Sequence, residues 1–354
     1  MNIAELLGMA VAKQASDIFI VAGMPLSYKV ECRIEYQEEA KLSPAQIEDL
    51  IKELYELAGN RNMKKIQEEG DDDFSFALPS LSRFRANVFR QRGSLAAIIR
   101  IITFELPDYE KLRIPRTIID VAKLTKGMVL VTGPAGSGKS TTLACIINEI
   151  NRTRNAHVIT LEDPIEYLHR HDKSVVSQRE IGTDTESYVT GLRAALRQAP
   201  DVILLGEMRD YETIRTAMTA AETGHLVIST LHTIGAANTI DRIIDSFPPE
   251  QQQQIRVQIS MVMEGVISQQ LLPALDGGVQ PAFEIMFFNN AIRNLIRESK
   301  IHQIDNVIAT SQKEGMVSMD TSLIQMYQKG IISRETAINR SNNSELMEKK
   351  IERL

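Results

Sequence analysis

Residues 128–150 read MVLVTGPAGSGKSTTLACIINEI, and this stretch decides the fold. It begins with an apolar run typical of a buried strand, passes through a glycine-rich turn and ends in a segment with helical periodicity. The turn GPAGSGKS, at 133–140, fits the phosphate-binding motif G-x-x-x-x-G-K-[ST] in the strand–turn–helix setting that this motif requires. The stretch therefore predicts an α/β domain that binds the phosphates of a nucleotide.

The chemistry of this loop follows from its residue types. Its glycines let the backbone curl so that several N–H groups face one point, and the helix N-terminus adds its dipole. Lys139 is expected to reach the β- and γ-phosphates, and Ser140 is the expected ligand of Mg²⁺. The predicted nucleotide-binding residues of the loop are Gly133, Pro134, Ala135, Gly136, Ser137, Gly138, Lys139, Ser140 and Thr141.

Three further apolar runs, HVITL, DVILLG and HLVIST, are bounded by turn signals and separated by helical stretches. That alternation is typical of a parallel sheet with crossover helices, in which ligands bind at the carboxyl ends of the strands. DVILLGE ends in Glu207, with Gly206 where a Walker B motif usually has Asp, and we expect its strand to neighbour that of the phosphate loop. Glu207 is predicted to polarise the attacking water or to hold the water shell of the metal. Glu162 and Asp163 add a second acidic strand end.

The segment TGHLVISTLHT contains two histidines, His225 before an apolar run and His232 after it. His232 is expected at the carboxyl end of a core strand, where it could donate a hydrogen bond to the γ-phosphate and report its presence. His225 is counted among the nucleotide-binding candidates. Metal ligation by the pair is less favoured, because no third ligand is spaced with them.

Residues 1–103 mix a helix with strands and predict a small α+β domain. DIFIVAG and SYKVECRIEYQ alternate apolar and polar residues, DDDFSFAL, RFRANVFRQ and SLAAIIRII are further strands, and LSPAQIEDLIKELYELAG is a helix. Asn2 and Glu5 have the spacing of a capping box at the N-terminus. The acidic run at 68–73 is compatible with metal binding and more typical of a solvated turn before a strand.

A change of pattern separates the two parts of the chain. FELPDYEKLRIP carries two prolines and mixed charge, so 104–116 is predicted to be a linker. Residues 117–354 are predicted to form the second domain. From about residue 250 the chain reads as one helix after another, which predicts a C-terminal helical subdomain.

Five arginines lie between residues 83 and 100, namely Arg83, Arg85, Arg90, Arg92 and Arg100. One interpretation is a solvated strand face with affinity for nucleic acid. The other is a set of arginine fingers, which stabilise the charge of a transferring phosphoryl group and can be supplied in trans. Arg85 and Arg100 are the best finger candidates, and a finger in trans implies an oligomer.

Composition restricts the remaining function classes. The net charge is −6, which disfavours non-specific binding of nucleic acid. Cys32 and Cys145 are the only cysteines, so neither a disulfide framework nor a cysteine-rich zinc site is supported, and a reduced, cytosolic protein is expected. The N-terminus lacks the basic region of a signal peptide, and the uncharged run 223–240 is a poor membrane span. A role at a membrane would therefore need a partner.

The segment AIRNLIRE, at 291–298, has the periodicity of an amphipathic helix. Its apolar residues Ile292, Leu295 and Ile296 share one face and are predicted to pack inward. The simplest interpretation of the rest is an ordinary charged helix surface. The alternative is that the charged residues couple the nucleotide state to a partner or to neighbouring helices, and these residues are Arg293, Arg297 and Glu298.

Over nearly its whole length the chain resembles the secretion-ATPase superfamily of bacterial type II secretion and type IV pilus motors. GPAGSGKSTTL is similar to its Walker A motif, ITLEDPIEY to its Asp box, DVILLGEMRD to its atypical Walker B motif and AETGHLVISTLHT to its His box. RFRANVFRQRG is similar to the arginine-bearing strand of its N-terminal domain, and AIRNLIRE to a motif of its retraction motors. Assembly motors typically add a long N-terminal extension and a four-cysteine zinc motif. We expect this chain to lack both, which favours retraction.

The resemblance implies an α/β protein, with a PAS-like α+β domain followed by a RecA-like P-loop ATPase domain with C-terminal helices. It implies ATP and Mg²⁺ as cofactors, and an ATP site between the two domains that arginines of a neighbouring subunit complete. It further implies a homohexameric motor that retracts a pilus by domain closure, at the cytoplasmic face of the inner membrane and against a membrane platform protein.

Two alternatives stay open beside the retraction motor. The first is an assembly or secretion motor with the same chemistry. The second is a P-loop switch protein that binds nucleic acid. The acidic balance of the chain opposes it, and so does the absence of runs in which basic and aromatic residues alternate. We expect no stable nucleic-acid partner and no transmembrane segment.

Overall fold

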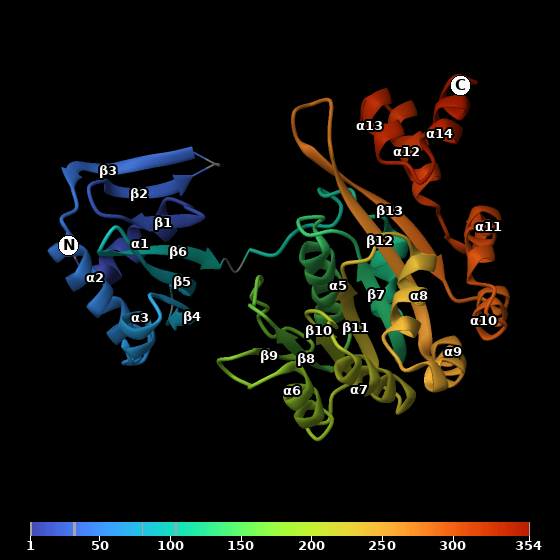
Figure 1. Cartoon of the computed structure of the whole chain (residues 1–354), viewed down its shortest axis with the longest axis horizontal. Helices are drawn as coiled ribbons and strands as arrows, with labels where there is room; N and C mark the ends of the chain where they lie inside the picture. The colour runs from blue at the N-terminus through green and yellow to red at the C-terminus, as the bar shows by residue number, and fades with distance from the viewer. Residues whose placement is uncertain (1, 31–32, 80, 103–104, 354) are drawn as a thin grey trace. The chain divides into compact units, whose positions relative to one another are not determined.

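The computed structural model describes residues 2–30, 33–79, 81–102 and 105–353, which form two compact units (Figure 1). The first unit is Met1–Glu105 with Glu166–Leu168, and the second is Leu106–Ile165 with His169–Leu354. Cys32 lies outside the described residues. Cys145 is buried, as expected of a packed residue on the helix after the phosphate loop, and burial raises the pKa of its thiol to about 12.

The first unit is built on a six-stranded antiparallel sheet in the order β3-β2-β1-β6-β5-β4. Its apolar core packs α1 and α2 against one face of this sheet, which confirms the predicted α+β domain. The elements are α1 (Ile3–Ala12), β1 (Asp17–Ile20), β2 (Pro25–Val30), β3 (Arg33–Lys41), α2 (Pro44–Leu57), α3 (Lys64–Glu68), β4 (Asp71–Leu78), β5 (Ser82–Gln91) and β6 (Ser94–Ile102).

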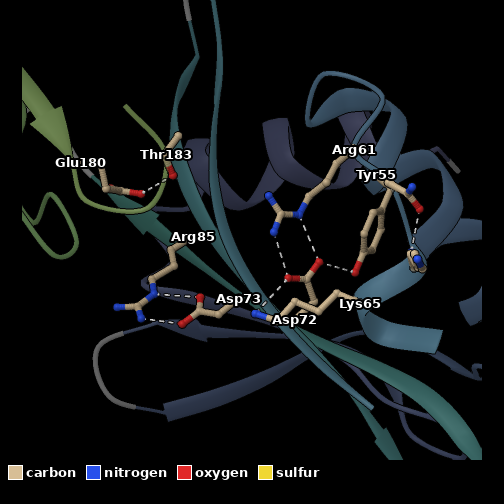
Figure 2. A network of polar contacts seen from close by, with 10 residues as sticks. Tyr55, Arg61, Lys65, Asp72, Asp73, Arg85, Glu180 and Thr183 are labelled. Carbon is tan, nitrogen blue, oxygen red and sulfur yellow. Dashed lines mark hydrogen bonds and ion pairs between the residues drawn. The ribbon is translucent and has the colours of Figure 1, made fainter. Parts of the chain in front are cut away.

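Two polar features of the first unit follow from the sequence. The capping box is confirmed, because the Asn2 side chain accepts the Glu5 N–H at 2.9 Å and the Glu5 carboxylate accepts the Asn2 N–H at 3.2 Å. The acidic run ends inside β4 and not in a turn. Figure 2 shows its Asp72 buried between Tyr55, whose hydroxyl donates at 2.9 Å, and Arg61, which donates twice at 3.0 Å.

The second unit contains a seven-stranded sheet in the order β13-β12-β7-β11-β10-β8-β9. All neighbours are parallel except β13, which pairs with β12 in the antiparallel sense. The first elements of this unit are α4 (Arg116–Ile119), η1 (Asp120–Lys123), β7 (Gly127–Thr132), α5 (Lys139–Thr153), β8 (His157–Glu162), β9 (Val175–Glu180), α6 (Tyr188–Ala195), β10 (Val202–Leu205), α7 (Tyr211–Glu222), β11 (Leu226–Leu231), α8 (Ala236–Asp245) and α9 (Pro249–Val262).

Helices cover both faces of this sheet because successive strand residues point in opposite directions. Met128 and Leu130 of β7 pack with α6, α7, α8 and α9 on one face. Val129 and Val131 pack with α4 and α5 on the other. This three-layer arrangement confirms the predicted α/β class.

The prediction of uninterrupted helices after residue 250 is wrong. Two strands follow α9, and β12 lies between β7 and β13 in the sheet. Consecutive residues of β12 are buried along most of its length, so both of its faces are covered. A strand buried on both faces shows no alternation of apolar and polar residues, and its apolar run can be mistaken for helix. The strands are β12 (Met263–Pro273) and β13 (Val279–Phe287).

Helices resume beyond Phe287, and the last three lie together beside the β12–β13 hairpin (Figure 1). Leu323, Ala337 and Met347 belong to their small separate core. Among the residues that the structure describes, none of the helices combines the length and the hydropathy that crossing a membrane demands. The last elements are α10 (Asn290–Arg297), η2 (Ile301–Gln303), α11 (Ile304–Thr310), η3 (Gln312–Glu314), α12 (Met319–Gln328), α13 (Arg334–Asn339) and α14 (Ser344–Ile351).

Candidate active site

Four predicted segments lie at the carboxyl ends of four parallel strands, which together form one edge of the second sheet. The phosphate loop follows β7, His232 follows β11, Glu207 follows β10 and Glu162 ends β8. The sheet order places them along the edge in that sequence. The expectation that the Glu207 strand neighbours β7 is wrong, because β11 is inserted between them and brings His232 next to the phosphate loop.

The phosphate loop has the backbone that its glycines predict. Gly138 precedes α5 in the left-handed region, with φ of +86°. Gly133 has φ of +141°, and a Cβ there would overlap the carbonyl oxygen of Gln269. The Lys139 side chain is buried, and its ammonium donates to the carbonyl oxygens of Gly133 and Pro134, both at 2.9 Å. The lysine is thereby held against the loop that it serves.

The polar atoms around the loop fit a nucleotide polyphosphate. Ser137 is buried, and its hydroxyl finds no hydrogen-bond partner among the described residues. The same holds for the hydroxyl of Thr132, at the end of β7. Buried polar atoms are normally paired, so orphaned donors beside a helix N-terminus indicate a place for an anionic ligand. Ser140 and Thr141 occupy the first turn of α5.

Gln269 of β12 braces the phosphate loop, and sequence reasoning missed it. Its side-chain oxygen accepts a hydrogen bond from the Thr142 hydroxyl at 2.7 Å in a buried setting. Its amide nitrogen would lie 2.8 Å from a Cβ built at Gly138. No motif marks this glutamine, because the contact joins residues 127 positions apart.

The Glu207 carboxylate contacts two side chains, those of His232 and Arg209. Its side chain is largely buried; one carboxylate oxygen lies 3.3 Å from Nε2 of His232, and the other forms an ion pair with Arg209. The hydrogen bond with Glu207 raises the pKa of Arg209. Arg209 was not predicted, although its place two residues after Glu207 on the same loop was a usable signal.

Tyr188 lies close to the glycine that precedes Glu207. A Cβ at Gly206 would lie 2.8 Å from the Tyr188 hydroxyl, so any larger residue there, such as the usual Asp of a Walker B motif, would have to displace this hydroxyl. Burial raises the pKa of the Tyr188 phenol, and the charges of Asp163 and Glu207 act in the same direction. Tyr188 is therefore a neutral side chain at the acidic edge.

Glu162 is oriented by its neighbours in the sheet. Its carboxylate accepts hydrogen bonds from the Thr160 hydroxyl and from the Gln178 amide, the latter at 3.1 Å. These bonds hold one oxygen within the sheet.

The structure does not bring His225 to this edge. Its carbonyl oxygen accepts the Gly127 N–H at 3.0 Å, where β7 begins, and its Nδ1 lies 2.9 Å from the Ala220 carbonyl oxygen. Because β7 and β11 are parallel and in register, the residue before β11 lies at the opposite edge from the phosphate loop. We leave His225 out of the proposed site.

Arg85 and Arg100 are paired within the first unit. Arg85 donates to the Asp73 carboxylate at 2.9 Å and 2.5 Å (Figure 2), and Arg100 forms an ion pair with Asp17 at 2.9 Å. The Arg100 side chain is 68% exposed and that of Arg85 is 36% exposed. Both arginines therefore lie at the surface of this unit, and their role as fingers stays a prediction.

The AIRNLIRE segment forms α10. The inward packing of Ile292 and Ile296 is confirmed, since both are fully buried, and Leu295 is partly buried against the same core. Arg293 donates to the carbonyl oxygens of Ser260 at 2.7 Å and Phe288 at 3.1 Å. Its guanidinium also lies 3.2 Å from Glu264, so this arginine ties the end of α9 to the start of β12.

Comparison with known proteins places these motifs in context. The family described as "Type II/IV secretion system protein" matches residues 2–350. The "Type IV pilus retractation ATPase PilT" of Pseudomonas aeruginosa is 44% identical over 337 residues, which cover 95% of this chain and 97% of that protein. A "Twitching motility protein" of Neisseria gonorrhoeae is 50% identical over 290 residues, with coverage of 81% and 78%. The "Crystal Structure of the Pilus Retraction Motor PilT and Bound ADP" superposes with a TM-score of 0.90 at 44% identity, and each chain is covered completely.

Proposed function

This chain belongs to the family of type II/IV secretion system proteins and is an ATPase of the pilus-retraction kind, and from that premise we propose how its residues drive the motor. Six copies form a ring, and each copy binds ATP at the strand edge of its second unit. Hydrolysis alternates closed and open states of the two units, and this motion acts on the pilus. The observation that carries the chemistry is the row formed by the phosphate loop, His232, Glu207 and Glu162.

Each group in the row has its own task. The loop N–H groups and Lys139 bind the phosphates, for which Lys139 exchanges its bonds to the carbonyl oxygens of Gly133 and Pro134. Glu207 takes the proton of the attacking water, because it is largely buried and fixed by Arg209 and His232. His232 lies between the loop and Glu207 in the sheet order, where it senses the terminal phosphate.

The residues present also fit Mg²⁺. The hydroxyl of Ser140 and the carboxylate of Glu162 are hard oxygen ligands, of the type that this ion prefers. Mg²⁺ held there would neutralise negative charge on the phosphates. Ser140 would ligate the ion, and Glu162 would hold water molecules bound to it.

The ring supplies what one copy lacks. We propose that Arg85 and Arg100 leave their ion pairs with Asp73 and Asp17 to stabilise charge on the nucleotide of a neighbouring copy. The exchange is inexpensive for Arg85, because both side chains of its pair with Asp73 are partly exposed and surface ion pairs contribute only about 0–1 kcal/mol. It costs more for Arg100, because its partner Asp17 is buried. The ring works at the cytoplasmic face of the inner membrane against a platform protein.

The variant Glu207→Gln tests the assignment. It should bind ATP with near-normal affinity, because the phosphate loop is intact, and hydrolyse it about 10²- to 10⁴-fold more slowly, because the general base is gone. Nucleotide binding and phosphate release are measured on the same purified protein. Glu222→Gln, on the exposed surface of α7, is the matched control and should keep full turnover. Near-normal turnover of Glu207→Gln would transfer the role of base to Glu162.

A further inference from the structure

Glu284 is a buried carboxylate that no step of the proposed hydrolysis uses. It lies on β13 with 2% of its surface exposed. One oxygen accepts the Ala236 N–H at 2.7 Å, and the other accepts the Met319 N–H at 3.2 Å. Ala236 begins α8 and Met319 begins α12, so one side chain holds the starts of two helices.

The start of α8 depends on side chains from the sheet. A helix leaves its first N–H groups unsatisfied, and a side-chain oxygen at the N-cap usually accepts one of them. The N-cap of α8 is Gly235, which has no side chain to do so. Ser268 of β12 accepts the Gly235 N–H at 2.9 Å, and Glu284 accepts the next N–H along the chain. Ser268 and Glu284 are direct partners across the two strands.

These bonds fix a short loop that carries a predicted active-site residue. β11 ends at Leu231, so only the segment from His232 to Gly235 separates the sheet from α8. The loop is therefore held at one end by the strand and at the other by Ser268 and Glu284. Its first residue is the one that contacts Glu207 at 3.3 Å.

The other end of the connection is the C-terminal helix group. α12 packs with α13 and α14 around a core of its own, separate from the main sheet core. Leu272 of β12 and Ala282 of β13 belong to that core, so the hairpin carries the group. Glu284 is the charged side chain through which α12 reaches the His232 loop.

We propose that Glu284 is a positioning residue for ATP hydrolysis, which fixes the His232 loop to α12 so that movement of helices α12–α14 resets His232 against Glu207. The inference rests on the proposed function and adds a route by which a load on the C-terminal helices controls turnover. A neutral amide at this position keeps the size of the side chain and loses one of the two acceptors. One of the two helices is then released.

The test compares Glu284→Gln with the wild-type full-length protein in its assembled form. We expect kcat for ATP to fall about 10- to 100-fold, because small displacements of a catalytic group have effects of that size. KM and the affinity for ADP should stay unchanged, because the bonds of Glu284 go to the starts of α8 and α12. Binding of ADP with aluminium fluoride should weaken by a factor similar to the loss of kcat, since this complex mimics the transition state.

Three further variants separate positioning from a purely structural role. Ser318→Ala removes the cap that α12 supplies to itself, where the Ser318 hydroxyl accepts the Thr321 N–H at 3.3 Å, and it leaves Glu284 in place. It should lower the melting temperature and keep kcat. Met319→Ala removes the buried Met319 side chain and keeps the N–H that α12 offers to Glu284, so it is the matched control. Met319→Pro removes that side chain together with the N–H, at a helix position where proline is favoured. It should reproduce the loss of kcat, and it serves as the test if Glu284→Gln does not fold.

The outcomes are distinguishable. Wild-type kcat in folded Glu284→Gln or folded Met319→Pro overturns the inference and leaves the proposed function intact. A loss of kcat that matches a fall in the number of nucleotide sites per chain also overturns it, because the defect is then one of folding. A wild-type protein that binds ADP and does not hydrolyse ATP overturns the proposed function itself.

Discussion

Lys139 binds the phosphate loop itself, and we propose that it binds the phosphates when a nucleotide is present. Its ammonium is already bound to two loop carbonyl oxygens, so it is close to the position that a phosphate needs. Lys139→Ala should lose nucleotide affinity and turnover together, with binding weaker by about 10- to 100-fold, the equivalent of a charged hydrogen bond of about 1.5–3 kcal/mol. A fluorescent nucleotide measures the affinity. Lys123→Ala, at an exposed lysine paired with Asp120, should bind normally; equal losses in both variants would contradict a specific role.

Glu284 should give the stability of the protein a recognisable pH dependence. Burial raises the pKa of Glu284 above its ordinary value. The folded chain then keeps this proton at pH values where the unfolded chain has released it, so the stability contributed by Glu284 falls as pH rises through that window.

Because Glu284→Gln has no such titration, its melting temperature should improve relative to the wild type as pH rises above about 4, the ordinary pKa of a glutamate. Thermal unfolding of both proteins across that range measures the difference. A difference that stays constant with pH would argue against a raised pKa.

At the scale of residues, the sequence predicts those that a motif contains and misses those that support them. The phosphate loop and Glu207 are local patterns, readable from spacing and from the strand before them. Arg209, Tyr188 and Gln269 act on these groups through contacts that depend on the sheet order. Gly206 departs from the usual Walker B motif, and only the structure shows that a side chain there would meet the Tyr188 hydroxyl.

At the scale of elements, α10 carries two arginines, Arg293 and Arg297, that have the same predicted role but different surroundings in the structure. Arg293 is largely buried and bonded to the end of α9, whereas Arg297 is exposed and bonded to Asn294 of its own helix. Arg293→Glu should therefore lower the free energy of unfolding by about 3 kcal/mol, because it leaves unpaired carbonyl groups beside a like charge on Glu264. Arg297→Glu should leave stability within about 0.5 kcal/mol of the wild type.

Chemical unfolding of the two α10 variants tests this difference. ATPase activity and twitching motility on Arg297→Glu then show whether the exposed face of α10 couples hydrolysis to a partner. Loss of motility with normal turnover would support coupling, and normal motility would make α10 an ordinary surface helix. A stable Arg293→Glu would show that the contacts with α9 contribute little.

The strands β12 and β13 show where element prediction fails and why. Strands β7, β8, β10 and β11 are short apolar runs bounded by turn signals, and the sequence predicts all four. The segment 263–273 places glutamines and a serine among its apolar residues, and Ser268, Gln269 and Gln270 are all buried. Each of these polar side chains binds a residue far away in the chain: Ser268 binds Gly235, Gln269 binds Thr142 and Gln270 binds Arg340. The sequence around β12 gives no sign of these contacts.

At the scale of the whole molecule, we propose that each ATP site is shared between two subunits, which can be tested only with more than one chain. Mixed rings of Arg85→Ala and Lys139→Ala subunits should regain part of the activity that each variant lacks, because some interfaces pair an intact phosphate loop with an intact arginine. Rings of Glu207→Gln and Lys139→Ala subunits are the control. Both of these changes lie in the second unit of the same chain, so no interface is complete and activity should stay absent. Failure of the first mixture in verified mixed rings would argue against arginines in trans.

The sequence predicts the succession of an α+β and an α/β domain because hydrophobic periodicity changes between them. Ring formation depends on complementary surfaces, which have no fixed periodicity and no local motif. The arginines of β5 and β6 illustrate this, since spacing alone permits a solvated face, a nucleic-acid surface or a set of fingers. Their ion pairs with Asp17 and Asp73 show charged partners that any further role must displace.

The close approach of Gly133 to the Gln269 carbonyl group limits which residues position 133 can tolerate. The carbonyl group that a side chain at 133 would strike belongs to a strand with neighbours on both sides, so it has no room to retreat. Gly136 also has a positive φ, yet a Cβ there meets nothing within 4 Å. In a saturation library selected for twitching, every substitution at 133 should disappear, while asparagine at 136 should persist, because it tolerates left-handed backbone best. Two glycines of the same loop would then have opposite tolerance profiles, one set by a neighbouring strand and the other by backbone conformation alone.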